Sequence, residues 1–353
     1  MSSKLVPNNL IGVVTWIGCI QLLIYLTSCA TASDNSYPDG SSILLTFPAH
    51  WPKPLPLTED QSITPAKIKM GRALFFDPIL SRDSSISCAS CHHAGRAFTD
   101  GLTLSKGIHQ RQGTRNTPTL VNLMYQPHFF AEGGSPSLEL QVLGPLETEH
   151  EMDFSILEAV QRLKQHPAYS DMARMAFGRE PDPYVITRSL AAFERTLISF
   201  RSPYDEFKAN GDSSLLSVEA MRGMELFFSK RLACATCHHG PNLTDYQFHS
   251  LGLTHLGDAD LGRYRITLDS GDMGAFKTPT LRNVALTAPY MHDGSIPSLD
   301  SVINFFAHGG GAGMNTSHLI HPIALEKQEK RDLKAFLEAL TDSSYVQGYA
   351  RLN

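Results

Sequence analysis

The chain has 353 residues, of which 42% are hydrophobic and 18% are charged, and its formal net charge is -5. This composition is typical of a globular protein that buries a core, and the length suits about two domains. The negative balance and the lack of a basic tract argue against nucleic acid as a partner.

The N-terminal segment predicts export. Lys4 precedes an apolar run over about residues 10–26, and small residues follow it, which is typical of a secretory signal peptide. Cys29 follows Leu-Thr-Ser, as in the lipobox of a bacterial lipoprotein, and a lipid on this Cys would hold the protein on a membrane face; ordinary cleavage nearby is the alternative. We predict a signal peptide with a lipobox over residues 1–29 and a tether over residues 30–60. The expected location is the periplasm or, through a lipid anchor, the outer membrane.

Two short motifs of the form C-x-x-C-H organise the rest of the chain. They are Cys88, Cys91 and His92, and Cys234, Cys237 and His238. This is the attachment signature of a c-type haem, in which two thiols bond to the porphyrin and the following His binds the iron. A disulfide, a redox pair or a zinc site would not explain a His at the same place twice. We therefore predict two covalently bound haem c groups.

The surroundings of the two motifs repeat as well. Residues 71–76 resemble residues 223–228, and both tracts predict a short amphipathic helix with an aromatic end. Downstream, residues 117–139 recur as residues 278–300 at a constant offset of 161. Coincidence does not easily hold one offset over so long a block, so internal duplication is predicted.

The pattern between and after the motifs is helical. Asp182 and Pro183 predict the start of a helix, and residues 327–340 predict a terminal helix that covers the second haem. Gly, Pro, Ser and Asn crowd the haem motifs, which indicates long ordered loops. The predicted fold is therefore mainly α, with two c-type cytochrome domains over residues 61–215 and 216–345.

The residues near the first motif suggest different chemistry for its haem. An iron with an open or displaceable sixth position can react with oxygen species, whereas one with two strong ligands transfers electrons. His109, in a Gly-flanked loop, could bind the first iron in a resting form; an exposed loop His is the alternative. A peroxide-cleaving site also needs a carboxylate to carry a proton. Glu151 is one of three acids with Glu147 and Glu149, and Gln141 could orient peroxide or simply lie on a helix surface.

These features resemble the bacterial dihaem cytochrome c peroxidase family, which includes the MauG-like enzymes that oxidise residues of a partner protein. The resemblance spans about residues 64–341. It implies that the first haem reacts with hydrogen peroxide and that the second collects electrons from a small donor protein, a cytochrome c or a cupredoxin. It implies roles for four residues: His92 as proximal ligand, His109 as displaceable distal ligand, Gln141 as active-site amide and Glu151 as acid–base carboxylate.

The resemblance also implies a calcium ion between the haems. Its protein ligands would be the side chain of Asn116 and the backbone carbonyls of Thr287 and Pro289. Oxygen ligands from both halves suit a hard cation, although Asn116 could equally be a turn residue. Members of the family often form homodimers, but no patch of this sequence requires one.

The chain departs from the family pattern between the haems. Ala131 stands where the family usually has a Trp, and an Ala side chain cannot relay an electron or hold a radical. Tyr125, Phe129 and Phe130 are nearby aromatic residues, but no spacing argument selects one of them.

A second departure concerns the sixth ligand of the second haem. Phe306 matches the position of Met in the peroxidases and of Tyr in the MauG-like branch, and a Phe cannot bind iron. His308 is the first candidate for the sixth iron ligand and Met314 is the second. A His ligand would favour a low reduction potential of this haem, and a Met ligand would raise it. A His stabilised by the dipole at a helix C-terminus is the alternative for His308.

Three functions are consistent with these observations. The leading expectation is a dihaem peroxidase, and the second is a MauG-like enzyme that oxidises Tyr or Trp on a partner. The absence of a Met ligand at Phe306 favours the MauG-like enzyme, whereas the presence of His109 and the absence of a Trp at Ala131 argue against it. The third is a pure electron-transfer cytochrome, which Gln141 and Glu151 argue against.

Overall fold

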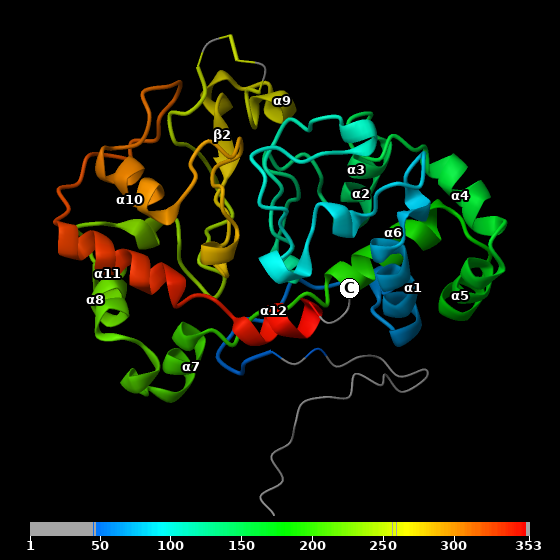
Figure 1. The fold of residues 1–353 in the computed structure, drawn as a ribbon, viewed down its shortest axis with the longest axis horizontal. Helices are drawn as coiled ribbons and strands as arrows, with labels where there is room; N and C mark the ends of the chain where they lie inside the picture. Colours follow the sequence, from blue (N-terminus) through cyan, green and yellow to red (C-terminus); the bar gives the residue numbers. More distant parts are fainter. Residues whose placement is uncertain (1–44, 46, 256, 259, 351–353) are drawn as a thin grey trace, which may run out of the picture. The chain divides into compact units, whose positions relative to one another are not determined.

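The computed structural model describes residues 45, 47–255, 257–258 and 260–350 (Figure 1). The predicted signal peptide, Cys29 and most of the predicted tether lie outside the described residues. None of the helices in the described ranges has the length and apolar character needed to cross a bilayer.

The described chain is mainly helical, as predicted, with one small antiparallel sheet of β1 and β2. The helices are α1 Pro65–Phe76, α2 Leu138–Gln141, α3 Leu143–Glu147, α4 Ile156–Lys164, α5 Pro167–Phe177, α6 Pro183–Glu194, α7 Pro203–Asn210, α8 Val218–Phe228, α9 Tyr264–Thr267, α10 Leu299–Ala307, α11 Lys327–Glu338 and α12 Ser343–Ala350. The strands are β1 Phe248–Ser250 and β2 Ala275–Lys277. Long loops with short 3-10 turns connect these elements.

Polar caps set where the helices begin. The Asp182 side chain accepts a hydrogen bond from the backbone N–H of Val185, and Pro183 is the first residue of α6, which confirms the predicted start. Ser137 and Ser298 cap α2 and α10 in the same way. A side-chain oxygen at this place satisfies one of the backbone N–H groups that a helix leaves unpaired.

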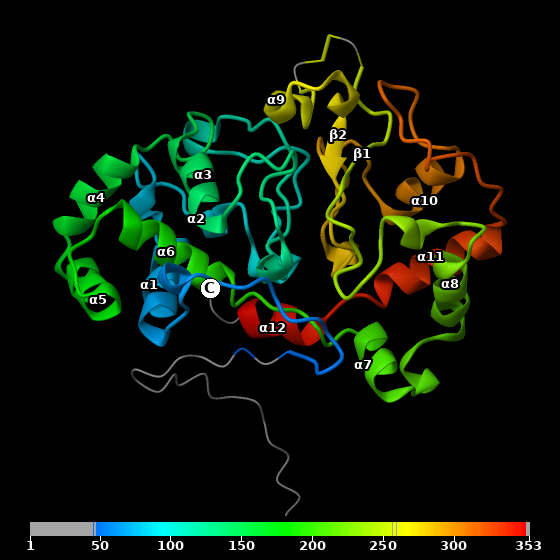
Figure 2. The same cartoon turned by 180° about the vertical axis from the view of Figure 1, so that it is seen from behind.

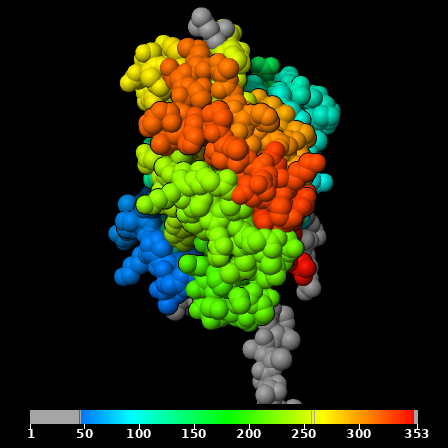
Figure 3. Space-filling view, turned by 90° about the vertical axis from the view of Figure 1, so that its left-hand side faces the viewer, coloured from blue at the N-terminus to red at the C-terminus, as the bar shows by residue number. Residues whose placement is uncertain are grey.

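One crossed pair of helices organises each half of the chain. Helix α1 packs on α6, and α8 packs on α11 (Figures 1 and 2). Figure 3 shows α8 in green beside α11 in red on one face of the second half. The crossing is close because a Cβ on Gly71 would lie 1.8 Å from the Ser189 carbonyl oxygen, and one on Gly223 would lie 1.9 Å from that of Asp332. Only Gly permits these two backbones to approach so closely.

Buried aromatic residues fill each crossing in matching ways. The ring centroids of Phe75 and Phe193 lie 5.1 Å apart in the first half, and those of Phe227 and Phe336 lie 5.1 Å apart in the second. Each pair belongs to the hydrophobic core of its own half. The recurrence of these contacts is what the sequence repeat predicts.

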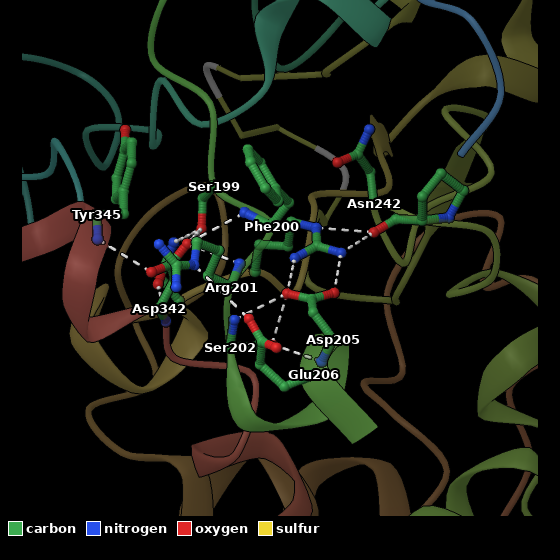
Figure 4. A network of polar contacts seen from close by, with 12 residues as sticks. Ser199, Phe200, Arg201, Ser202, Asp205, Glu206, Asn242, Asp342 and Tyr345 are labelled. Carbon is green, nitrogen blue, oxygen red and sulfur yellow. Dashed lines mark hydrogen bonds and ion pairs between the residues drawn. The ribbon is translucent and has the colours of Figure 1, made fainter. Parts of the chain in front are cut away.

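A buried polar network joins the two halves (Figure 4). The Asn122 side-chain amide donates to Asn242 Oδ1 at 2.8 Å and to the Ser199 carbonyl at 2.9 Å. Asp342 Oδ2 accepts from the Ser199 hydroxyl at 3.1 Å and from the backbone N–H groups of the two residues that follow Ser199, Phe200 and Arg201. Asn283 completes the network by donating to the Ser199 hydroxyl and accepting from the Asp342 N–H.

Both ends of the described chain pack where the predicted tether (residues 30–60) and the predicted domains (residues 61–215 and 216–345) did not place them. Helix α12 follows the second half but packs on the first, where the rings of Tyr345 and Phe98 lie 6.0 Å apart. At the other end, part of the segment predicted as a tether is packed: Trp51 is 9% exposed and contacts Tyr125, while the Arg282 guanidinium of the second half lies 4.5 Å from its ring. Residues 47–57 therefore act as a strap over both halves.

Candidate functional site: two haem-attachment centres

The first C-x-x-C-H motif presents its residues as an iron site requires. Cys88 begins a 3-10 turn, Cys88–Ser90, and neither Cys88 nor Cys91 is in a disulfide. The His92 ring nitrogen Nδ1 donates to the Phe98 carbonyl at 2.8 Å, which leaves Nε2 as the nitrogen for a metal. Burial lowers the pKa of His92, which favours the neutral imidazole. A neutral, oriented imidazole is the form that binds iron.

The second motif repeats this arrangement. Cys234 begins the 3-10 turn Cys234–Thr236, and the His238 Nδ1 contacts the Leu243 carbonyl at 2.9 Å. Burial also lowers the pKa of His238 and raises that of Cys234 to about 11. The donor sets of both motifs therefore fit a covalently attached haem with an axial His.

The Phe at the end of α1 and its counterpart on α8 position the two histidines. Phe75 lies 6.5 Å from the His92 ring, and Phe227 lies 6.4 Å from the His238 ring. Each Phe also belongs to the helix crossing of its half. The fold therefore ties each axial His to the most closely packed part of its half.

A buried ion pair anchors the short helix that carries Gln141. Gln141 ends α2 and is half-buried. Two residues earlier, Glu139 forms two hydrogen bonds with the Arg195 guanidinium, at 2.5 and 3.1 Å. Burial opposes the charge of Glu139, but its bonds to Arg195 hold its pKa below the usual value. No motif or spacing in the sequence pairs these two residues, although charged residues among the apolar ones at the end of α6 are a signal of a buried ion pair.

The structure distinguishes the three acids that the sequence left open. Glu147 Oε1 accepts from the Ile156 N–H at the start of α4. Glu149 is 78% exposed at its side chain and lies 3.4 Å from Arg111. Glu151 is half-buried, and burial raises its pKa while the nearby His150 lowers it. Glu151 is therefore the one of the three acids that is not exposed, and its acid–base role stays a prediction.

The loop that carries His109 packs on the backbone of Glu151. The Ile108 N–H donates to the Glu151 carbonyl at 2.9 Å, and a Cβ on Gly107 would lie 2.5 Å from the same oxygen. The Cys91 Sγ lies 3.9 Å from the Lys106 carbonyl, at the start of this loop. The loop thus connects the first haem-attachment motif to Glu151.

His109 itself points away from this contact. Its side chain is 57% exposed and lies 3.6 Å from Asp83. Its backbone φ is +53°, a left-handed conformation that is uncommon for a residue other than Gly. Its role as a ligand stays a prediction.

The candidates near the second haem also stay predictions. His308 is exposed at the end of α10, and its Nδ1 contacts the Asn304 carbonyl at 2.6 Å. Met314 is half-buried in a loop whose backbone bonds to Thr254 and Ser250. Phe306 lies on α10 with its ring 5.4 Å from that of Phe305.

The position of the missing Trp lies at a contact between the halves. The Ala131 carbonyl accepts from the Lys277 N–H at 2.7 Å, and the Lys277 ammonium donates to the His128 carbonyl at 2.7 Å. Nearby, Arg115 forms ion pairs with Glu132 and Asp260. Backbone and charged groups therefore join the halves where the family pattern has an aromatic ring.

Asn116 also lies between the halves. Its backbone N–H donates to the His292 carbonyl at 2.8 Å, and its Nδ2 donates to the Leu102 carbonyl at 2.7 Å. This leaves the amide oxygen Oδ1 as the atom suited to a cation.

Comparisons with known proteins find dihaem peroxidases and MauG-like proteins. A family model described as di-haem cytochrome c peroxidase matches residues 65–214. The methylamine utilization protein MauG of Methylorubrum extorquens is 37% identical over 319 residues, 89% of this chain and 90% of that protein. Cytochrome-c peroxidase IdrP1 of Pseudomonas sp. (strain SCT) is 35% identical and covers 92% of each chain. The crystal structure of a MauG-like protein associated with microbial copper homeostasis has a TM-score of 0.78 and 33% identity, over 85% of this chain and 97% of that one.

Proposed function

Because the chain belongs to the di-haem cytochrome c peroxidase family, we propose that it reduces hydrogen peroxide to water with electrons from a small redox protein, a cytochrome c or a cupredoxin. The balanced reaction consumes one peroxide, two electrons and two protons and yields two waters. Two haem c groups, held by the Cys pairs with His92 and His238 as axial ligands, supply the redox chemistry when bound.

The packing of the His109 loop on Glu151 carries this proposal. One short segment links a haem-attachment Cys, a candidate displaceable ligand and a half-buried carboxyl. Rotation of the His109 side chain alone would leave this backbone contact, and with it Glu151, in place. The position of His109 therefore suits an activation step at the first haem, and a pure electron-transfer cytochrome would have no need of it.

Glu151 and Gln141 would act on bound peroxide. Cleaving the O–O bond requires a proton to pass from the inner oxygen to the outer one, and the Glu151 carboxyl can accept and return it. Burial raises the pKa of Glu151 above that of an ordinary Glu, which favours the protonated form that returns the proton. Gln141 can hold the outer oxygen by a hydrogen bond from its amide, and the Arg195–Glu139 pair keeps α2 in place.

The test compares two acids that lie two residues apart. We expect Glu151→Gln to lower kcat for peroxide about 10²- to 10⁴-fold, as loss of a proton-transfer group does. Glu149→Gln is the matched control, because this side chain is exposed and pairs with Arg111, and it should leave kcat within about twofold. The assay uses the reductively activated holoenzyme with a reduced cytochrome or cupredoxin. No turnover by the wild-type protein, or equal loss in both variants, would contradict the proposal.

A second candidate function is MauG-like oxidation of Tyr or Trp residues on a partner protein. Phe306 favours it, because the second haem then lacks the Met ligand of the peroxidases. Incubation of the holoenzyme with peroxide and a co-encoded secreted protein distinguishes the two functions. A mass shift on that protein without donor-dependent peroxide consumption would support the second candidate.

We also propose a structural calcium ion held by Asn116 Oδ1 and the backbone carbonyls of Thr287 and Pro289. Residues from both halves would then hold one cation, which stabilises their relative placement. We expect chelation to lower the melting temperature and calcium to restore it, and Asn116→Ala to abolish this response. An unchanged melting temperature after chelation would contradict the site.

The proposed location is outside the cytoplasm, with the protein anchored by a lipid on Cys29. We expect wild-type protein in the membrane fraction and the Cys29→Ser variant in the soluble periplasmic fraction. Equal distribution of the two proteins would contradict the anchor.

A further inference from the structure

Glu194 is a buried carboxyl for which the proposed reaction has no use. It is the last residue of α6 and is 6% exposed. Its Oε2 atom has no hydrogen-bond partner among the described residues. An unsatisfied buried polar atom costs roughly 1–3 kcal/mol, so its presence in a closely packed helix crossing calls for a reason.

Glu194 directly follows a residue whose ring packs toward the first haem-attachment motif. The preceding residue, Phe193, packs on Phe75, and Phe75 in turn lies beside His92. Burial raises the pKa of the Cys88 thiol, and the Glu194 carboxylate raises it further. Charge on Glu194 and charge at the site that Cys88 holds therefore influence each other.

Among the described residues, Glu194 forms no ion pair with a cationic side chain, and the charged groups that act on it are Arg195 and Glu139. Its neighbour Arg195 is already paired with Glu139, which comes from α2. On α1, Lys67 donates to Ser62 instead. Burial raises the pKa of Glu194 to about 8; Arg195 lowers it and Glu139 raises it. The carboxyl therefore changes protonation near neutral pH with a small change in the local field.

The second half provides an internal comparison. A Cβ on Gly71 would meet Ser189 and Phe193, and one on Gly223 would meet Asp332 and Phe336. The residue that follows each Phe is therefore matched: Glu194 in the first half and Leu337 in the second. Leu337 is 7% exposed and lies in the second hydrophobic core. A Leu satisfies the packing of this position, so packing does not explain the carboxyl in the first half.

We propose that Glu194 couples electron uptake by the first haem to uptake of a proton. The ferric centre carries one more positive charge than the ferrous centre, and this charge favours the carboxylate. When an external reductant supplies one electron, the extra charge disappears and the Glu194 carboxylate takes one proton from solvent. No bond to iron forms or breaks. The inference requires haem at Cys88 and Cys91 and is independent of what the enzyme oxidises.

The test is a spectroelectrochemical titration of the holoprotein at pH values on both sides of neutrality, with dithionite as reductant. In the wild-type protein, the reduction potential of one of the two haems should fall as pH rises. The fall should be up to tenfold in the equilibrium constant for reduction per pH unit, which is about 59 mV for one electron. The other couple should lack this dependence. Infrared difference spectra should show a protonated-carboxyl band that gains intensity on reduction.

Two variants and one control isolate Glu194. Glu194→Gln keeps the size of the side chain, and Glu194→Leu reproduces the second half; both should abolish the pH dependence and the infrared band. Glu158→Gln, on the exposed face of α4, should change neither. Haem propionates remain in all variants, so a dependence that survives in both Glu194 variants would overturn the proposal. A wild-type protein whose two couples are both independent of pH would overturn it as well.

Discussion

Replacing Arg195 with Met would leave a carboxylate buried without its cation. The Arg195 and Glu139 side chains are 6% and 4% exposed and share two hydrogen bonds. Water cannot replace the guanidinium there, and Gln61, 3.1 Å away, would be the remaining partner of Glu139. Breaking a buried ion pair at one side costs about 3–5 kcal/mol. We expect Arg195→Met to lower the free energy of unfolding at neutral pH by this amount.

The pH dependence of this loss has a definite sign. Without Arg195, burial should raise the folded-state pKa of Glu139 above its unfolded value. The protonated form then stabilises the folded state below the unfolded pKa, and this contribution is lost as pH rises through the folded pKa. The penalty of Arg195→Met should therefore shrink as pH falls. Loss of the anchor on α2 should also lower peroxidase activity through Gln141.

Denaturant unfolding of three variants checks the reasoning. Replacing Arg195 and Glu139 together with Met should cost much less than Arg195→Met alone, since no charge remains buried. Asp300→Asn is the control, because the Asp300–Lys334 pair is exposed and should contribute about 0–1 kcal/mol. If Arg195→Met costs less than about 1 kcal/mol, or if the double variant is as unstable as the single one, the ion pair does not have the role assigned to it.

Three further predictions concern packing and pH. Gly71→Ala places a Cβ 1.8 Å from a carbonyl oxygen of α6 and should lower the free energy of unfolding by about 1–3 kcal/mol or more. Gly348→Ala, whose Cβ would enter open space beside α12, should leave the stability unchanged or raise it in the same thermal melt. Burial opposes the charge of Asp205, but Arg282 holds the pKa of this carboxyl below its usual value. The stability that this pairing contributes is complete above the unfolded-state pKa and is lost as pH falls through the folded-state pKa. Asp205→Asn should therefore make the free energy of unfolding less dependent on pH in acid, and an unchanged pH dependence would contradict this. Trp51→Ala should cost about 3–5 kcal/mol and speed proteolysis between the halves; equal digestion of both proteins would show that the strap does not hold them.

Local features of this protein were predictable from sequence. The two C-x-x-C-H motifs require their five residues to be consecutive, so the haem sites need no knowledge of the fold. The start of α6 at Pro183 depends on one capping side chain, and the close crossing at Gly71 repeats at Gly223. Such signals are readable because the interacting atoms are near in sequence or recur at a constant offset.

Tertiary structure decided what depends on distant partners. The family resemblance already favoured Glu151, but only the structure shows that it is half-buried while Glu147 and Glu149 are exposed; its role stays a prediction. The pairing of Glu139 with Arg195 spans 56 residues, and the packing of α12 on the first half places the end of the chain outside the half to which its sequence position assigns it. Long-range contacts of this kind arise when separate elements pack together, and a single sequence carries no spacing rule for them.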